Sequence, residues 1–335
     1  MKYFPNRYVE NDSKYYAIAD LPSLNSPEFS EYLINEIEFI NNKKQQQLVF
    51  VIFCVSAKCP YKCEYCYNSS EHSNQEILPL DTIIQSINEL KQIGVRNFYL
   101  SGGEPMMRSD DIPEILQNCM DKKTGFWILT TGWKITLEKL ILYKKLGLRG
   151  IVVSLDGINP DIVNSIKISK NAFENAINAI KTAKKAGLLV GIDSVFRKEM
   201  LSDENYEAHL EFLSNLGANF INCYSPKLLT DKNIQYEKFN ISDYKKLGEL
   251  NKKYRRSNKN KRKIIPYSPD IWESKRGCVG GKSFLFVNTN GDVKPCPFVK
   301  PSWGNILNEN ITSILQKNQL NFRICETNQE LMNNK

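Results

Sequence analysis

Three cysteines stand in one short run, Cys59-Pro-Tyr-Lys-Cys63-Glu-Tyr-Cys66, with three residues between the first pair and two between the second pair. Thiolates at such spacings bind iron–sulfur clusters or zinc. A cubane cluster has four irons, so three cysteines leave one iron open to bind a small molecule. A structural zinc site would need a fourth ligand close by, and His72 is the candidate in the sequence.

The surrounding sequence predicts an α/β protein with a parallel sheet. Residues 48–55 form an uninterrupted apolar run, typical of a strand buried on both faces of such a sheet. Further strands are expected at residues 97–100, 126–131, 150–154, 188–196 and 219–224. Helices are expected at residues 82–93 with Asp81 as cap, and at 112–120, 137–146, 172–186 and 205–216. The three cysteines therefore follow the first strand, at the carboxyl edge where such sheets bind ligands.

Glycine-rich and polar turns follow the next strands. They are Ser101-Gly102-Gly103-Glu104-Pro105, Thr130-Thr131-Gly132 and Ser154-Leu155-Asp156-Gly157. Together with the Cys-x3-Cys-x2-Cys run, in which the aromatic Tyr65 precedes the last cysteine, these turns resemble the motifs of the radical S-adenosylmethionine (radical SAM) enzymes. The resemblance covers residues 45–225 and implies the partial (β/α)6 TIM-like barrel of that family.

The resemblance also implies cofactors and an activity. Cys59, Cys63 and Cys66 would hold a 4Fe–4S cluster, whose open iron binds the methionine part of SAM. Reductive cleavage of SAM would then give a 5′-deoxyadenosyl radical that abstracts hydrogen from the substrate. The residues that the resemblance places around SAM are Tyr65, Gly102, Gly103, Glu104, Pro105, Thr131 and Ser154. Within this set, Glu104 would accept a hydrogen bond from the methionine ammonium, whereas Asp156 is interpreted as a turn residue outside the set.

The last third of the chain carries a second group of cysteines. Cys278 and Cys296 flank alternating apolar residues at 284–287 and a turn at 288–291, a pattern that predicts a β-hairpin. This arrangement resembles the SPASM extension of radical SAM enzymes, or its shortened form, Twitch, which hold auxiliary iron–sulfur clusters. Full SPASM domains have more cysteines, and only Cys325 follows here. We therefore expect one auxiliary iron–sulfur cluster on Cys278, Cys296 and Cys325. Its fourth ligand would be a non-cysteine residue, the substrate, solvent, or another cysteine such as Cys223.

Composition limits the remaining possibilities. The chain has 335 residues, 41% of them hydrophobic, and no long apolar span, so we expect a cytoplasmic protein without a membrane segment. Nine cysteines at metal-ligand spacings favour a reducing compartment over disulfides. The expected segments are an N-terminal extension at 1–45 with a helix at 28–41, the radical SAM partial barrel core at 46–240, a helix and basic linker at 241–276, and the auxiliary cluster domain at 277–335.

Charge and cysteine content leave several hypotheses about the partner. The net charge is +8, and residues 252–263 hold eight basic residues and no acid. This stretch is either a solvated linker or a surface that attracts an acidic partner. We favour the oxidative modification or cross-linking of a ribosomally made peptide. The alternatives are the modification of a small molecule, such as an aminosugar, porphyrin or lipid-like precursor, and a non-catalytic zinc protein that binds nucleic acid.

An enzyme of this kind needs further components. The resemblance implies an electron donor such as flavodoxin or ferredoxin, and it favours neither a membrane nor nucleic acid as partner. An auxiliary cluster suggests a net oxidation of the substrate, because it can accept an electron from a substrate radical. Some relatives carry an acidic base directly after the second auxiliary cysteine, whereas this chain has Pro297 there. A proton acceptor must therefore come from elsewhere, or the reaction needs none.

Overall fold

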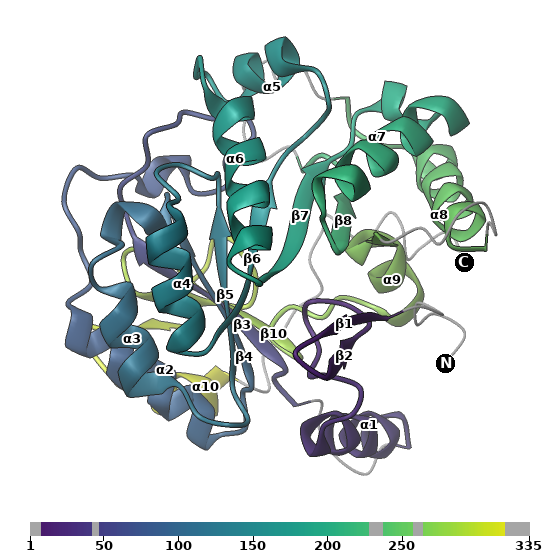
Figure 1. Ribbon diagram of the computed structural model, residues 1–335. Helices are drawn as coiled ribbons and strands as arrows, with labels where there is room; N and C mark the ends of the chain where they lie inside the picture. The colour runs from purple at the N-terminus through teal and green to yellow at the C-terminus, as the bar shows by residue number, and fades with distance from the viewer. Residues whose placement is uncertain (1–7, 42–46, 228–236, 257–263, 319–335) are drawn as a thin grey trace.

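The computed structural model describes residues 8–41, 47–227, 237–256 and 264–318 (Figure 1). Its centre is a ten-stranded sheet with the order β12-β11-β10-β3-β4-β5-β6-β7-β8-β9. The strands of this sheet are β3 (Phe50–Ser56), β4 (Asn97–Gly102), β5 (Gly125–Thr130), β6 (Leu148–Ser154), β7 (Leu189–Val195), β8 (Phe220–Tyr224), β9 (Ile265–Tyr267), β10 (Phe284–Val287), β11 (Asp292–Lys294) and β12 (Gly304–Asn305). From β10 through β3 to β9 all neighbours are parallel.

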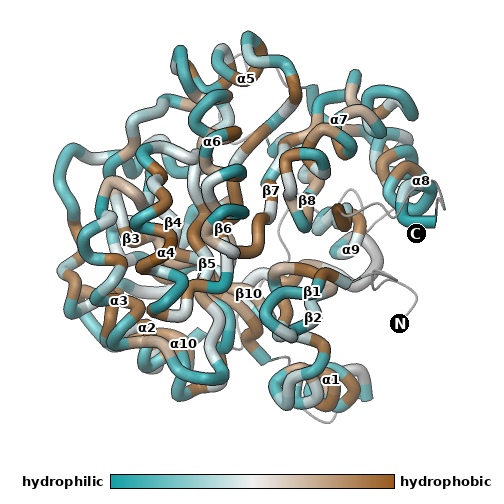
Figure 2. The backbone as a smooth tube through the Cα atoms, viewed as in Figure 1, coloured by the Kyte–Doolittle hydropathy of each residue, from teal (hydrophilic) through white to brown (hydrophobic). Residues whose placement is uncertain are grey.

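Helices alternate with these strands. They are α1 (Pro27–Ile40), α2 (Leu80–Gln92), α3 (Ile112–Cys119), α4 (Leu137–Lys145), α5 (Pro160–Ile166), α6 (Ala172–Lys185), α7 (Asp203–Leu216), α8 (Ile241–Arg256), α9 (Pro269–Arg276) and α10 (Ile311–Asn318). The convex side of the sheet is covered by α2, α3, α4, α6 and α7, whereas α1 lies apart beneath the N-terminal β-hairpin (Figure 1). Hydrophobic residues follow the central strands, and the outer helices alternate hydrophobic with hydrophilic residues (Figure 2). This pattern builds the main core between the sheet and its helices, with Phe53 and Ile87 among its fully buried members.

A second, smaller core lies on the other face of the sheet. A hairpin of β1 (Val9–Asn11) and β2 (Lys14–Tyr16) precedes α1. Tyr16 and Ala19 pack there with Tyr99, Trp127 and residues of the strands up to β9. The N-terminal segment therefore covers part of the concave face of the sheet, a packing that the sequence did not reveal.

The expected fold class is confirmed, because the sheet is mostly parallel, helices alternate with its strands, and the barrel is not closed. The expected strands and helices are present, with ends displaced by at most two residues. The predicted cap of α2 was wrong. This helix begins at Leu80 with Pro79 as its N-cap residue, so Asp81 lies in its first turn. By contrast, Ser26 caps α1, since its hydroxyl accepts the Phe29 N–H at 3.3 Å.

The predicted hairpin at the C-terminus is also present, and it extends the barrel sheet. β10 pairs antiparallel with β11 and parallel with β3, where Leu285 lies opposite Val51. The C-terminal extension is thus joined to the strand that leads into the three cysteines. The four segment boundaries expected from the sequence stay predictions, and residues 257–263 of the basic stretch lie outside the described residues.

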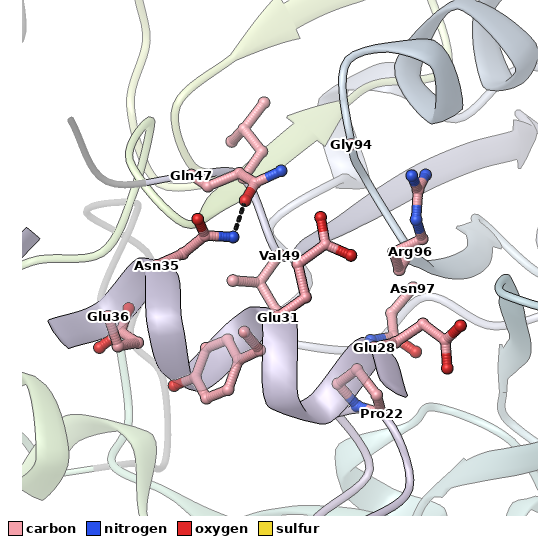
Figure 3. Close-up of a pocket in the computed structure, with 12 residues that line it drawn as sticks. Pro22, Glu28, Glu31, Asn35, Glu36, Gln47, Val49, Gly94, Arg96 and Asn97 are labelled. Carbon is pink, nitrogen blue, oxygen red and sulfur yellow. Dashed lines mark hydrogen bonds between the residues drawn. The ribbon is translucent and has the colours of Figure 1, made fainter. Parts of the chain in front are cut away.

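Two further features concern the surface. Within the described ranges, every helix is too short or too polar to cross a lipid bilayer. A pocket between α1 and the residues that lead into β3 and β4 is lined by Glu28, Glu31 and Arg96, among others (Figure 3). It lies at the amino ends of these strands, whereas the three cysteines follow the carboxyl end of β3.

Candidate active site

The three cysteines lie in the loop that follows β3, and each is half-buried. None of the described cysteines forms a disulfide. The Cys66 N–H donates to the carbonyl oxygen of Cys63 at 3.3 Å, so these two residues occupy one tight turn. The structure therefore presents three thiols from a single short loop at the carboxyl edge of the sheet.

The Gly102–Gly103 turn packs directly against this loop. Gly102 has a φ of +134°, a conformation that favours glycine. A Cβ added at Gly103 would lie 2.4 Å from the carbonyl oxygen of Lys58 and 2.9 Å from the Cβ of Cys59. The Gly103 N–H donates to the carbonyl oxygen of Ser56 at 2.8 Å, which ties the turn to the start of the loop. Only a residue without a side chain fits at this close approach to the cysteine loop, and the cofactor contacts of Gly102 and Gly103 stay predictions.

Glu104 lies deeper than the sequence suggested. Its carboxylate is fully buried, and burial raises its pKa. Oε1 accepts hydrogen bonds from the Met106 N–H (3.0 Å) and the Thr130 hydroxyl (2.8 Å), and Oε2 accepts from the N–H (2.8 Å) and hydroxyl (2.6 Å) of Thr131. Glu104 thus joins the turns after β4 and β5. Its predicted contact with the SAM ammonium stays a prediction, as do the cofactor contacts of Pro105, which opens a short 3-10 helix, and of Thr131.

A buried charge cluster lies beside the cysteine loop, and the sequence did not predict it. The side chains of Lys167 and Asp156 are each 1% exposed, and their charged groups lie 3.3 Å apart. The Lys167 ammonium donates to the hydroxyls of Ser154 (2.7 Å) and Tyr65 (3.0 Å), and the Tyr65 hydroxyl donates to Asp156. Asp156 also accepts the Val195 N–H at 2.8 Å, so it is a buried anion rather than a turn residue alone.

The surroundings of the thiols keep them protonated while no metal is bound. Burial raises the pKa of Cys59 to about 12 and that of Cys66 to about 11, and burial also raises the pKa of Cys63. The backbone N–H groups of Tyr61 and Asn68 point at the sulfurs of Cys59 and Cys66 and offset part of this rise. Iron binds thiolates, so loading of this loop must release protons.

His72 lies near the last cysteine of the loop. Its Nε2 is 3.8 Å from the Cys66 sulfur, and burial lowers its pKa. Among the described residues, no group of three or more His, Cys, Asp and Glu side chains is arranged to hold a metal ion. The other histidine, His209, is buried in the core, where its Nε2 lies 3.3 Å from the Ser194 hydroxyl oxygen.

An acidic side chain faces the concave side of the sheet next to the charge cluster. Asp193 on β7 is the register partner of Ser154 on β6 and of Asn222 on β8. Its Oδ1 accepts a hydrogen bond from Asn222 Nδ2 at 2.8 Å. Burial, reinforced by the charges of Asp20 and Asp156, raises the pKa of Asp193 to about 7. This carboxyl can therefore take up or release a proton near neutral pH.

The C-terminal cysteines come together around Gly280. A Cβ added there would lie 3.2 Å from the Cβ of Cys296 and 3.6 Å from the sulfur of Cys278. The Phe298 N–H donates to the Cys296 sulfur at 3.3 Å, a contact that favours a thiolate. Cys325, the third expected ligand, lies outside the described residues. Cys54 and Cys119 are buried in the core, as expected for thiols without a metal.

Comparison with known proteins identifies the family. Residues 53–224 match the model of the radical SAM superfamily, and residues 278–333 match SPASM, an iron–sulfur cluster-binding domain. The chain belongs to the radical SAM superfamily, as the cysteine motif suggested. This membership carries a 4Fe–4S cluster and SAM as cofactors, with further iron–sulfur binding in the C-terminal domain. Thiolates are the ligands that iron–sulfur clusters take, so the residue type of the cysteines in both regions suits these groups. The zinc hypothesis loses its support, because the chain belongs to a family of iron–sulfur enzymes.

Curated relatives cover different shares of the chain. It is 30% identical over 173 residues to a GTP 3′,8-cyclase of Helicobacter pylori, a match over 50% of this chain and 52% of the cyclase. It is 28% identical over 162 residues to a PqqA peptide cyclase of Ruegeria pomeroyi, covering 48% and 42% of the two chains. An AdoMet-dependent heme synthase of Methanosarcina barkeri is 25% identical over 299 residues, covering 83% and 84%. The chain spans about half the length of the cyclases that it matches.

A solved structure supports the fold. SuiB of Streptococcus suis, solved with its precursor peptide SuiA, has a TM-score of 0.69 and 17% identity. The match covers 98% of this chain and 78% of SuiB. The arrangement of strands and helices is thus shared with this protein over nearly the whole chain.

Proposed function

We propose that this chain is a radical SAM enzyme that modifies a ribosomally made peptide by oxidation or cross-linking. The observation that carries the activity is the loop of three half-buried thiols with the Gly102–Gly103 turn packed onto it. Cys59, Cys63 and Cys66 hold the catalytic cluster. When bound, the cluster and SAM supply a 5′-deoxyadenosyl radical that abstracts hydrogen from the substrate.

The residues around the loop orient the cofactor. The backbone of Gly102 and Gly103 offers a surface without side chains next to Cys59. Ser154 and the Lys167 ammonium provide a hydroxyl and a positive charge at the carboxyl end of β6, where they favour an anionic group. Asp156 pairs with Lys167 at 3.3 Å. The ion pair and the hydrogen bonds fix these side chains, which lowers the cost of ordering them on binding.

The substrate class follows from similarity alone. PqqA peptide cyclase and SuiB, which was solved with a precursor peptide, support a peptide substrate. The match to the heme synthase covers 83% of this chain and 84% of the synthase, which favours modification of a small molecule as the second candidate. For an oxidation, Asp193 is the group that we propose as proton acceptor, because it faces the concave side and Pro297 cannot serve.

The shared chemistry is tested first. Protein purified without oxygen and reconstituted with iron and sulfide should form 5′-deoxyadenosine from SAM in the presence of a strong reductant. Cys63→Ala should abolish this product, and the matched Cys119→Ala variant, which removes a core thiol, should keep it. SAM cleavage by Cys63→Ala would overturn the assignment of the catalytic loop. Candidate peptides from neighbouring genes then separate the two substrate classes.

A further inference from the structure

Glu71 joins the cysteine loop to the C-terminal hairpin. This residue lies five positions after Cys66, at the end of a short 3-10 helix over Ser69–Glu71. Its Oε1 accepts a hydrogen bond from Asn288 Nδ2 at 2.8 Å and pairs with the Lys294 ammonium at 3.2 Å. Its carbonyl oxygen accepts the Thr289 hydroxyl at 3.3 Å. A single residue of the loop thus contacts both β11 and the turn between β10 and β11.

Tyr67 makes a second contact between the same two regions. It directly follows Cys66, and its ring meets Phe286 of β10 edge-on, with ring centres 5.7 Å apart. The ring also meets Phe298 edge-on, with centres 6.0 Å apart. The N–H of this phenylalanine donates to the Cys296 sulfur. The residue after the last catalytic cysteine therefore packs on the residue that contacts an auxiliary cysteine.

These contacts close a ring of interactions. β3 leads into the cysteine loop, the loop contacts the hairpin through Tyr67 and Glu71, and β10 of the hairpin pairs with β3. Both ends of the loop are thereby fixed to one unit of the sheet. Closing a flexible segment in this way removes conformations in which the three thiols are apart.

The contact is buried enough to matter energetically. Asn288 is fully buried, Thr289 is 2% exposed, and the side chains of Lys294 and Glu71 are 13% and 14% exposed. Glu71 Oε2 is buried and has no hydrogen-bond partner among the described residues. Burying a carboxylate oxygen without a hydrogen bond costs free energy. The contacts of Glu71 with Lys294 and Asn288 must therefore offset this cost.

We propose that Tyr67 and Glu71 are positioning residues that lock the catalytic cysteine loop onto the C-terminal hairpin, so that the loop retains iron only while the hairpin is docked. The inference rests on the proposed function, because it takes the loop as the catalytic cluster site. It gives the C-terminal domain a second role beyond holding its own cluster. Replacing a residue that holds a metal ligand in place typically lowers metal affinity about 10- to 100-fold.

The test compares Glu71→Gln, Lys294→Gln and the double variant with the wild type. The matched control is Glu309→Gln, which removes the same charge from an ion pair with Lys317 elsewhere on the C-terminal domain. After anaerobic reconstitution, iron release to a chelator is followed through the part of the electron paramagnetic resonance spectrum that changes on addition of SAM. We expect release about 10- to 100-fold faster for Glu71→Gln and Lys294→Gln, with no further gain in the double variant.

A second measurement needs no cluster. In the apoprotein, amide hydrogen exchange should accelerate at residues 284–294 in Glu71→Gln but not in Glu309→Gln. Tyr67→Phe should release iron as slowly as the wild type, because the aromatic ring remains. Tyr67→Leu, which removes the ring, should release iron faster. Unchanged iron release and exchange in Glu71→Gln would overturn the proposal. Wild-type protein that binds no cluster would instead overturn the proposed function, and the exchange comparison would still test the docking contact.

Discussion

Asp193→Asn should make the apoprotein more stable, and increasingly so as the pH rises. The carboxyl has a pKa of about 7 in the folded protein, raised mainly by burial, against an ordinary value of 3.8. Between these two pH values the folded protein holds a proton that the unfolded chain has lost. The free energy of unfolding therefore falls as the pH rises from about 4 to about 7, where the folded protein also loses the proton.

The size of the effect follows from the same two values. A rise from 3.8 to about 7 corresponds to about 4 kcal/mol of unfolding free energy, lost at about 1.4 kcal/mol per pH unit. Asparagine is neutral at every pH, and its Oδ1 can still accept the hydrogen bond from Asn222. The unfolding free energy of the variant should therefore rise relative to that of the wild type by about 2 kcal/mol between pH 5 and pH 7.

Urea unfolding of both apoproteins at pH 5, 6, 7 and 8, followed by tryptophan fluorescence, measures this difference. Asp110→Asn, which neutralises an exposed carboxyl, is the matched control and should follow the wild type within about 0.5 kcal/mol. Parallel pH profiles for Asp193→Asn and the wild type would refute the reasoning. The carboxyl would then be ionised without cost, and its proposed part in proton transfer would lose its physical basis.

Two further predictions concern the groups around the cysteine loop. Lys167→Met should destabilise the apoprotein by about 3–5 kcal/mol in urea unfolding, because it leaves Asp156 buried without its counter-charge; wild-type stability would contradict the buried pair. Gly103→Ala should cost about 1–3 kcal/mol and lower iron loading, because its Cβ would clash with the carbonyl oxygen of Lys58. Gly157→Ala, with 3.7 Å to the nearest atom, should be tolerated, and equal losses in both alanine variants would refute the close approach.

Much of the fold follows from patterns that are local in the sequence. The apolar run at residues 48–55 predicted β3, and the periodicity of residues 172–186 predicted α6 to within one residue. Short elements gave no such signal. β9 spans only Ile265–Tyr267 and α5 only Pro160–Ile166, too few residues for a period to show. Asp81 was misplaced because α2 starts at Leu80, one residue before it.

The site was predictable where one segment carries it and not where distant segments meet. The cysteine run and the Gly102–Gly103 turn are readable as motifs. The pairing of Lys167 with Asp156 instead depends on the tertiary structure, which brings the residue after α5 back to the end of β6. Lysine is rarely buried, so nothing in the sequence marked Lys167. The contact of Glu71 with Asn288 spans 217 residues and depends on the parallel pairing of β10 with β3.

The proposed catalytic site is a cluster on three cysteines with one iron open to SAM. Electron paramagnetic resonance of the reduced, reconstituted protein, recorded with and without SAM, shows whether SAM reaches that iron. We predict that SAM shifts the signal in the wild type, and that the shifting signal is missing in Cys63→Ala. A wild-type spectrum that does not respond to SAM, or a loop that holds zinc without sulfide, would contradict the account.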